Sequence, residues 1–324
     1  MPALIVRPDA VRHNLTLLEA LCHAAGAGLM PVFKEAPLHP DLTCALLEGS
    51  HVSSLGVIAW AGHSLPRAAG LEFHHVYSPA PALMPAACCH DAVYAGSLFS
   101  LLELKKTSRG RLPALRITLE TGDCRDGALP EEIPALCQKA LDLGFTVLGI
   151  SANFACLTAS PPTPDAMDTA AHALRSMRRL VPDAALSVGG TDILEYAKHH
   201  PLPAGVDEIR CGTGMMLGVY PLSAAPIPGA RQDTFRLEAK VLECRRKQGK
   251  LLALLDAGIF HTAMEHTSPE IPGLCFAGES SAYSVFDVTS CQERIEEGMT
   301  LSFSLDYRSL ARALSSQALP LLLE

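Results

Sequence analysis

The chain has 324 residues, of which 48% are hydrophobic, and its formal net charge is −8 at pH 7. This length allows one large domain with a smaller one, and the apolar content excludes a disordered chain. The negative charge argues against a nucleic-acid-binding protein that relies on phosphate contacts. The sequence has no apolar run long enough to span a membrane and no secretory signal at its start, so we expect a cytoplasmic protein.

Short apolar runs alternate with helix-like segments over the first two thirds of the chain. A helix is predicted over 8–25, and eight candidate strands follow at 29–33, 52–58, 74–78, 92–96, 114–120, 147–154, 185–188 and 208–211. Apolar stripes and favourable first turns predict further helices at 39–48, 130–143, 163–179 and from Thr191. This alternation predicts a parallel (β/α)8 TIM barrel. A doubly wound open sheet is the competing fold, but it gives no reason for the strand count to stop there.

The sequence changes character after Tyr220. Several prolines and Gly229 form a linker-like stretch, and β-type runs follow at 234–244, 251–256 and 300–305. A hairpin turn is predicted at 247–250 and a helix at 309–313. We therefore predict a barrel over 8–225 and a smaller β-rich C-terminal domain over 226–324, to which residues 1–7 add a strand.

The 11 cysteines of the chain are scattered, and none forms a Cys-x-x-Cys pair. This pattern indicates reduced, buried thiols rather than disulfides. The histidines that come closest to a metal-binding spacing are His261 with His266, His74 with His75, and His199 with His200. Because no cysteine joins them at a recognisable spacing, we predict no structural metal.

Lys34 stands at the end of the first predicted barrel strand. An amine is costly to bury, but on the rim of a barrel it can form a Schiff base with an aldehyde cofactor. The alternative is a strand-end lysine that extends into solvent. Chemistry in a barrel takes place at the carboxyl ends of the strands, where other polar residues should then gather.

Polar residues do follow the later strands. Arg125 comes after the strand at 114–120, and Asn153 and Cys156 end the strand at 147–154. Two glycine-rich turns, 189–191 and 212–214, expose backbone amides at the point where barrels often bind a phosphate. Tight turns need glycine in any case, so the shared position of the two turns is what favours a phosphate site.

A phosphate site opposite a strand-end lysine fits pyridoxal 5′-phosphate. Arg210 would then donate to the pyridine nitrogen of the cofactor, and because arginine keeps its proton, it would leave that nitrogen unprotonated. The alternative for Arg210 is an ion pair at the barrel rim with Glu208.

Together these segments resemble the fold-type III pyridoxal-phosphate enzymes, the alanine racemase group, and most closely its ornithine racemase-like branch. The similarity lies in residues 32–34, 120–127, 152–156, 187–191, 208–212, 226–229, 232–233 and 302–307. It implies a barrel followed by a β-domain, an amino-acid substrate, and a homodimer with sites at the interface, with no nucleic-acid or membrane partner.

By this resemblance, Lys34 is the Schiff-base lysine and Arg210 is the pyridine partner. Arg125 resembles the arginine that approaches the phenolic oxygen of the cofactor or the carboxylate of the substrate. The other implied cofactor-binding residues are Asn153, Gly190, Thr191, Gly212, Thr213 and Tyr307. The residues after Lys34 lack the tyrosine that binds the phosphate in alanine racemase.

The resemblance predicts an amino-acid racemase that interconverts L- and D-amino acids through an external aldimine. Lys34 would transfer the Cα proton on one face, and Cys156 is our candidate for the other face. Simple burial is the alternative for Cys156, and Cys124, His261 and Tyr307 are alternative acids or bases. Other activities left open are a decarboxylase, a D-amino-acid aldolase or dehydratase, a non-catalytic pyridoxal-phosphate-binding protein, and a barrel enzyme acting on phosphorylated sugars.

Overall fold

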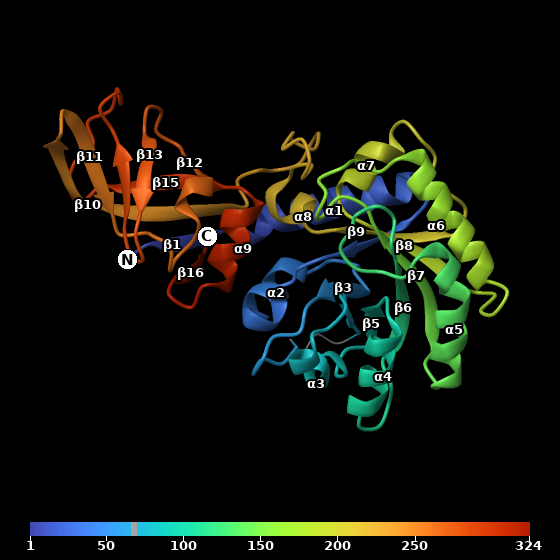
Figure 1. Cartoon of the computed structure of the whole chain (residues 1–324). Helices are drawn as coiled ribbons and strands as arrows, with labels where there is room; N and C mark the ends of the chain where they lie inside the picture. The colour runs from blue at the N-terminus through green and yellow to red at the C-terminus, as the bar shows by residue number, and fades with distance from the viewer. Residues whose placement is uncertain (66–69) are drawn as a thin grey trace. The chain divides into compact units, whose positions relative to one another are not determined.

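The computed structural model describes residues 1–65 and 70–324. Contacts between residues divide the chain into two compact units, both drawn in Figure 1. The barrel unit consists of Arg12–Met215 and Val219–Ala230, and the β-rich unit consists of Met1–Val11, Met216–Gly218 and Arg231–Glu324. The boundaries predicted from the sequence, 8–225 and 226–324, remain our proposal for the two domains, separately from this division by contacts.

Eight parallel strands form a nearly closed barrel within the described part of the chain. They are β2 (Gly28–Pro31), β3 (Ser54–Val57), β4 (Glu72–His75), β5 (Ala92–Ala95), β6 (Ala114–Leu119), β7 (Val147–Asn153), β8 (Ala185–Gly189) and β9 (Val206–Cys211). The order of neighbours is β2-β9-β8-β7-β6-β5-β4-β3, and a parallel bridge between Val32 and Gly56 links the two ends of this row. The predicted barrel is therefore confirmed, and the open doubly wound sheet is wrong.

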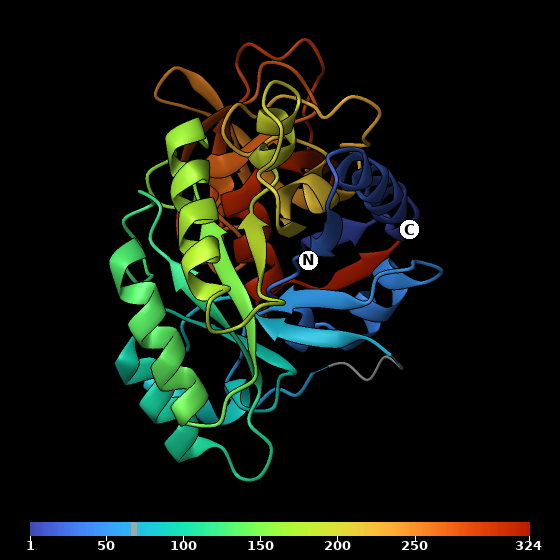
Figure 2. The same cartoon turned by 90° about the vertical axis from the view of Figure 1, so that its right-hand side faces the viewer.

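Helices cover the outside of this barrel. They are α1 (Pro8–Ala24), α2 (Pro40–Leu47), α3 (Met84–Ala87), α4 (Leu98–Thr107), α5 (Ile133–Asp142), α6 (Pro164–Met177), α7 (Asp192–Ala197) and α8 (Thr213–Leu217), with short 3₁₀ turns at Ala36–Leu38, Pro81–Leu83 and Pro130–Glu132. Figure 2 shows α5 and α6 side by side along the outer face of the strands. The Thr163 hydroxyl accepts from the Ala166 N–H and so caps the start of α6, where the sequence predicted it.

The sequence did not predict α4, although Ser97 caps its first turn. This helix buries Leu101 and Leu104 but leaves Leu98, Phe99 and Leu102 exposed. Apolar residues on both faces remove the one-sided periodicity by which an amphipathic helix is recognised. No helix of residues 1–65 or 70–324 has both the length and the apolar character needed to cross a membrane.

The β-rich unit is built on an antiparallel sheet. Its strands are β1 (Ala3–Val6), β10 (Phe235–Lys247), β11 (Lys250–Leu255), β12 (Thr267–Pro269), β13 (Cys275–Glu279), β14 (Ser284–Asp287), β15 (Thr300–Leu305) and β16 (Leu321–Leu323), with a 3₁₀ turn at Met264–His266 and the helix α9 (Tyr307–Ser315). The order is β12-β15-β10-β11-β14-β13, and β1 pairs with both β10 and β16. Lys247 pairs with Lys250 at the predicted hairpin turn.

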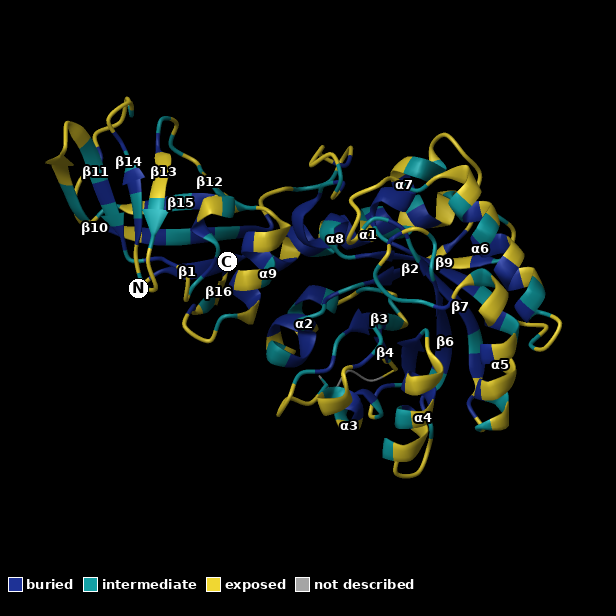
Figure 3. Cartoon of the chain, viewed as in Figure 1, coloured by how far each residue is buried: buried dark blue, intermediate teal, exposed yellow. Residues whose placement is uncertain are grey.

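Burial follows the strand period in both units. The first half of β10 alternates between the buried residues Phe235, Leu237, Ala239 and Val241 and more exposed ones. In Figure 3 the barrel strands are mostly dark blue, whereas the outer faces of α5 and α6 are yellow. The core of each unit therefore lies against its sheet, as the patterning of the sequence requires.

Candidate active site

Arg210 on β9 points into the barrel. The carbon Cζ of its guanidinium lies 5.3 Å from the centre of the Tyr94 ring, which comes from β5, a strand that does not neighbour β9 in the sheet. Nη1 of Arg210 donates to Oγ of Ser187 at 2.5 Å, and Nη2 donates to the Ala152 carbonyl oxygen at 2.9 Å. Arg210 is only 6% exposed, so this cation is held in place inside the protein.

The guanidinium of Arg210 has no anionic partner within the part of the chain that the structure describes, where no carboxylate oxygen lies within 4.0 Å of it. The ion pair with Glu208 considered from the sequence is therefore wrong, since Glu208 instead lies 3.5 Å from Nε of Arg116. A buried cation without a carboxylate in direct contact is costly, because its charge is removed from water and only a more distant charge compensates it. This is the state expected of an arginine whose partner is a ligand.

Gly189, at the end of β8, leaves room for two side chains of the site. A β-carbon at this position would lie 2.7 Å from Nη2 of Arg210 and 2.9 Å from Oδ1 of Asn153. Both distances are shorter than van der Waals contact allows. The absence of a side chain here is therefore what lets Asn153 and Arg210 approach each other.

Asn153 is tied to a buried carboxylate. Its Nδ2 donates to Oδ2 of Asp123 at 3.0 Å, and the other oxygen of Asp123 accepts from the backbone N–H of Leu157 at 2.8 Å. The thiol of Cys156 donates to Oδ1 of Asn153 at 3.4 Å. Cys156 is exposed, so the alternative of a packed core cysteine is wrong.

Lys34 and Arg125 meet at one aromatic ring. Nζ of Lys34 lies 5.2 Å from the centre of the Tyr77 ring, and Cζ of Arg125 lies 4.9 Å from the same centre. Nε of Arg125 is also 3.9 Å from Oδ2 of Asp123. A continuous series of contacts therefore runs from Lys34 to Asn153, across the carboxyl ends of the barrel strands. Lys34 is partly buried rather than fully extended into solvent.

Tyr77 and Asp123 were not among the predicted site residues. Tyr77 follows β4, and Asp123 lies between β6 and Arg125. Their position after barrel strands was the available signal, but nothing local in the sequence shows that one ring lies near two cations.

The two glycine-rich turns lie together, as predicted. Oγ1 of Thr191, after β8, accepts from the Gly214 N–H, after β9, at 3.1 Å. A β-carbon on Gly212 would approach the Val32 carbonyl oxygen to 3.1 Å, whereas one on Gly190 would meet nothing nearer than 4.0 Å. The backbone at Gly190 therefore borders open space. Thr213, which directly follows Gly212, begins α8.

Two of the predicted residues belong to the β-rich unit, and a third lies on the loop that follows β6. Tyr307 begins α9 of the β-rich unit and is 45% exposed, and His261 belongs to the same unit. The thiol of Cys124 is exposed and points to the Gly122 carbonyl oxygen at 3.7 Å. The barrel unit by itself thus contains Lys34, Arg125, Asn153, Cys156, Arg210 and both glycine-rich turns.

The histidine pairs considered as metal ligands have other contacts. His266 lies 3.1 Å from a carboxylate oxygen of Asp306, and His75 packs edge-on against His90. Across residues 1–65 and 70–324, no three or more His, Cys, Asp or Glu side chains are grouped so that they could hold a metal ion.

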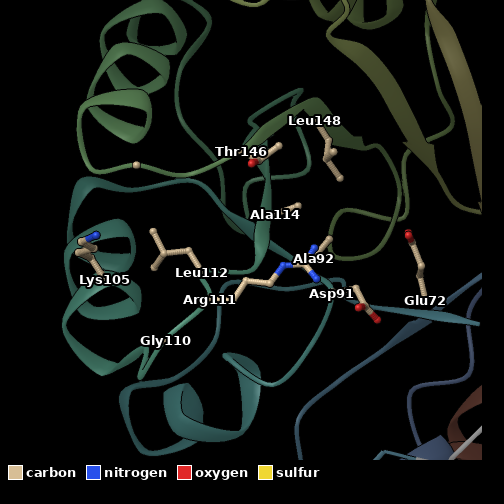
Figure 4. Close-up of a pocket in the computed structure, with 11 residues that line it drawn as sticks. Glu72, Asp91, Ala92, Lys105, Gly110, Arg111, Leu112, Ala114, Thr146 and Leu148 are labelled. Atoms are coloured by element: carbon tan, nitrogen blue, oxygen red, sulfur yellow. The ribbon is translucent and has the colours of Figure 1, made fainter.

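A cavity of about 480 Å³ lies at the opposite end of the barrel. Figure 4 shows its charged lining residues Glu72, Asp91, Lys105 and Arg111. Its walls include the first residues of β4, β5 and β6, and therefore the amino ends of these strands. Active sites of barrels lie at the carboxyl ends, so we assign the chemistry to the cluster around Arg210 rather than to this cavity.

The sequence of this chain is similar to those of known proteins. Residues 6–221 match the model of the alanine racemase N-terminal domain. The chain is 22% identical to an ornithine racemase from Acetoanaerobium sticklandii, over 98% of each protein. It is 23% identical to a lysine racemase from Thermotoga maritima, over 61% of this chain and only 62% of that protein.

Solved structures show the same fold. An alanine racemase from Corynebacterium glutamicum is similar with a TM-score of 0.75 at 17% identity, covering 100% of this chain and 99% of that one. A D-threo-3-hydroxyaspartate dehydratase from Delftia sp. HT23 is similar with a TM-score of 0.72 at 17% identity, covering 97% and 92%. At these identities the likeness concerns the fold alone.

The resemblance predicted from the sequence is thus confirmed by independent matches over most of the chain. The barrel and the β-rich unit form the architecture that the resemblance implied, and the sequence matches extend over the barrel and, for the ornithine racemase, over nearly the whole chain. The chain belongs to the alanine racemase N-terminal domain family, whose members include the fold-type III pyridoxal-phosphate racemases.

Proposed function

We propose that this protein is a pyridoxal 5′-phosphate-dependent amino-acid racemase that works as a homodimer. The observation that carries the proposal is the buried guanidinium of Arg210, which has hydrogen bonds to neutral oxygens but, among the described residues, no carboxylate within 4.0 Å. The unprotonated pyridine nitrogen of the cofactor could accept a hydrogen bond from the Arg210 guanidinium without adding a second charge. Lys34 lies at the same end of the barrel, linked to this region through Tyr77, Arg125, Asp123 and Asn153.

The residues of the site fit the cofactor. Lys34 would hold its aldehyde carbon, Arg210 would donate to its pyridine nitrogen, and the backbone of the two glycine-rich turns would hold its phosphate. The open space beside Gly190 supports the last of these roles. Arg125 would face the phenolic oxygen of the cofactor or the carboxylate of the substrate, and Asn153 would pack near the ring. Tyr307 of the β-rich unit is the remaining cofactor-binding candidate that the family resemblance implies.

The reaction needs two groups that exchange a proton with Cα from opposite faces. Pyridoxal phosphate, when bound, withdraws electrons and makes the Cα–H of the attached amino acid acidic. The Lys34 amine would remove or return the proton on one face. The exposed thiol of Cys156, beside Asn153, is our candidate for the other face. Each such group contributes about 10²–10⁴ to the rate.

The test is an assay in deuterium oxide on single enantiomers of alanine, lysine, ornithine and other amino acids. A racemase gives loss of optical rotation together with deuterium at Cα, because the abstracted proton exchanges with solvent. Release of ammonia with a 2-oxo acid from a 3-hydroxy amino acid such as serine or threonine would indicate a dehydratase instead, and release of carbon dioxide a decarboxylase. Either product, without racemisation, would contradict the proposal.

Two variants connect the assay to the residues. Lys34→Ala should lose racemisation of both enantiomers, because it removes the cofactor attachment and one proton-transfer group. Cys156→Ser should lower the rate by about 10²-fold or more if the thiol acts on the second face. Cys124→Ser, which changes an exposed thiol on the neighbouring loop, is the matched control and should keep the wild-type rate. Equal rates for wild type and Cys156→Ser would exclude the thiol and leave Tyr307 and His261 as candidates.

A further inference from the structure

The interior of the barrel below Arg210 holds a second set of charges, grouped around the buried Arg116. Arg116 on β6 is 5% exposed, and its Nη2 lies 2.9 Å from Oδ2 of Asp207. Its Nε lies 3.5 Å from Oε1 of Glu208. The same oxygen of Glu208 accepts from the Tyr94 hydroxyl at 3.1 Å. Barrel interiors are normally filled by branched apolar side chains, so this charged set is unusual for the fold.

The backbone is adapted to this arrangement. Leu186 pairs with Val206 and Ser187 pairs with Glu208, so Asp207 is an extra residue in β9. Such a bulge changes the direction of neighbouring side chains. Here it lets two successive carboxylates, Asp207 and Glu208, both reach Arg116. Two residues with the normal strand alternation would point to opposite faces.

Glu208 is connected to Arg210 by two routes. On the first route, its carboxylate holds the Tyr94 hydroxyl, and the Tyr94 ring packs against the Arg210 guanidinium. On the second, Ser187 accepts from Nη1 of Arg210 and lies near enough to Glu208 to stabilise its ionised carboxylate. Burial raises the pKa of Glu208, but the charge of Arg116 and the interaction with Ser187 outweigh it, so the pKa is lowered and Glu208 is ionised at neutral pH.

We propose that Glu208 is a positioning residue for Arg210 and supplies the partly buried negative charge that tunes the group bound to Arg210. The proposal rests on the proposed function, because it takes the bound group to be the pyridine ring of the cofactor. Arg116 brings one positive charge to the interior and Arg210 brings another, whereas Glu208 is the carboxylate that contacts Arg116 directly and is linked to Arg210 through Tyr94. Asp207, whose side chain is 39% exposed, compensates Arg116 from the solvent side.

The remaining charged groups near Glu208 are few. His74 on β4 faces the same interior, where its ring lies 6.2 Å from that of Tyr94, and its Nε2 is 3.3 Å from the exposed carboxylate of Glu72. His74 and Arg210 both contribute to lowering the pKa of Glu208. Loss of the Glu208 charge therefore leaves an interior dominated by the two arginines.

The experiment compares Glu208→Gln with Asp207→Asn in the protein loaded with pyridoxal 5′-phosphate. Each variant removes one carboxylate from Arg116, but only Glu208 contacts Tyr94 and Ser187. The readout is the pH titration of the visible absorption of the bound cofactor. Because a positive interior favours the deprotonated form, Glu208→Gln should move the midpoint to lower pH by on the order of one unit. Asp207→Asn should move it much less, since its charge is screened by solvent.

The possible outcomes separate the two proposals. A wild-type protein that binds the cofactor, together with superimposable titrations for wild type and Glu208→Gln, would overturn the role of Glu208 and leave the racemase proposal intact. Equal shifts for Glu208→Gln and Asp207→Asn would also overturn it, because they would indicate a general effect of charge. A wild-type protein that gives no cofactor absorption at all would overturn the proposed function first.

A second variant covers the case in which Glu208→Gln does not fold. Ser187→Ala keeps every charge and removes the hydroxyl that accepts from Arg210 and interacts with Glu208. We expect it to weaken the affinity for pyridoxal 5′-phosphate by about tenfold, which is the effect of losing one charge-assisted hydrogen bond. Ser151→Ala on the neighbouring strand β7, also a buried serine, is the matched control and should leave the affinity unchanged. Unchanged affinity in Ser187→Ala would contradict the proposal.

Discussion

The two units of this protein differ in what they bury. In the described part of the chain, every buried His, Asp or Arg side chain belongs to the barrel unit: His74, His75, His90, Arg116, Asp123, Asp192 and Arg210. The buried polar residues of the β-rich unit are only hydroxyl side chains, Thr234, Thr262, Ser284 and Ser309. Burial of ionisable groups costs stability, and perturbed ionisable groups gather at functional sites, so this distribution favours the barrel unit as the location of the candidate site.

The core of the β-rich unit contains buried apolar side chains instead of buried ionisable ones. Phe286 and Phe303 are both nearly inaccessible, with ring centres 5.3 Å apart, and Leu237 and Leu255 are fully buried beside them in the same sheet. Apolar burial of this kind stabilises without directional requirements. The comparison predicts that the two units respond differently to truncation, to acid and to removal of charge.

The largest effect on stability is expected from Phe303→Ala. The substitution removes a fully buried aromatic ring and should lower the free energy of unfolding by about 3–5 kcal/mol. Denaturant unfolding monitored by circular dichroism measures it, with Phe99→Ala, an exposed phenylalanine of the barrel unit, as the control. A decrease in the free energy of unfolding below about 1 kcal/mol would mean that this core tolerates a cavity, and it would weaken the proposed difference between the two units.

Acid should affect the barrel unit through His75. Burial lowers the pKa of His75 from its ordinary value of 6.5 to about 4. The unfolded chain therefore binds a proton at a higher pH than the folded protein, and stability present above pH 6.5 is lost as the pH falls toward 4. Between pH 7.5 and pH 5, this single group should cost about 2 kcal/mol.

The measurement is the free energy of unfolding as a function of pH for wild type and His75→Phe. The wild type should lose about 2 kcal/mol more than the variant over this range. His261, in the β-rich unit, is less buried and serves as the control: His261→Phe should follow the pH dependence of the wild type more closely. Parallel curves for wild type and His75→Phe would show that the folded protein accommodates the charged imidazole.

The smallest effect on stability is expected at the site itself. Arg210→Leu removes a buried cation, and the gain from not burying a charge should offset the lost hydrogen bonds to Ser187 and Ala152. The free energy of unfolding of the cofactor-free protein should change by less than about 1 kcal/mol, while the affinity for pyridoxal 5′-phosphate falls. A large loss of stability with unchanged affinity would assign Arg210 to the structure rather than to the cofactor.

The sequence was informative where the signal is local. Periodicity located the barrel strands, and positions at or just after the carboxyl ends of these strands made Lys34, Arg125, Asn153 and Arg210 candidates before any contact was known. It was uninformative where the signal lies in contacts between distant residues. Tyr94 and Glu208 are 114 positions apart, and Arg116 and Asp207 are 91 apart. No local sequence pattern distinguishes a buried arginine that pairs with carboxylates, such as Arg116, from one without a carboxylate in contact, such as Arg210.

Reduction of the protein with borohydride in the presence of pyridoxal 5′-phosphate, followed by peptide mass analysis, tests the site most directly. The reduction fixes the cofactor covalently to the lysine that holds it. We predict that the modified peptide contains Lys34 and that the modification is absent from Lys34→Ala. A cofactor fixed to another lysine with Lys34 unmodified, or no selective modification, would contradict the assignment.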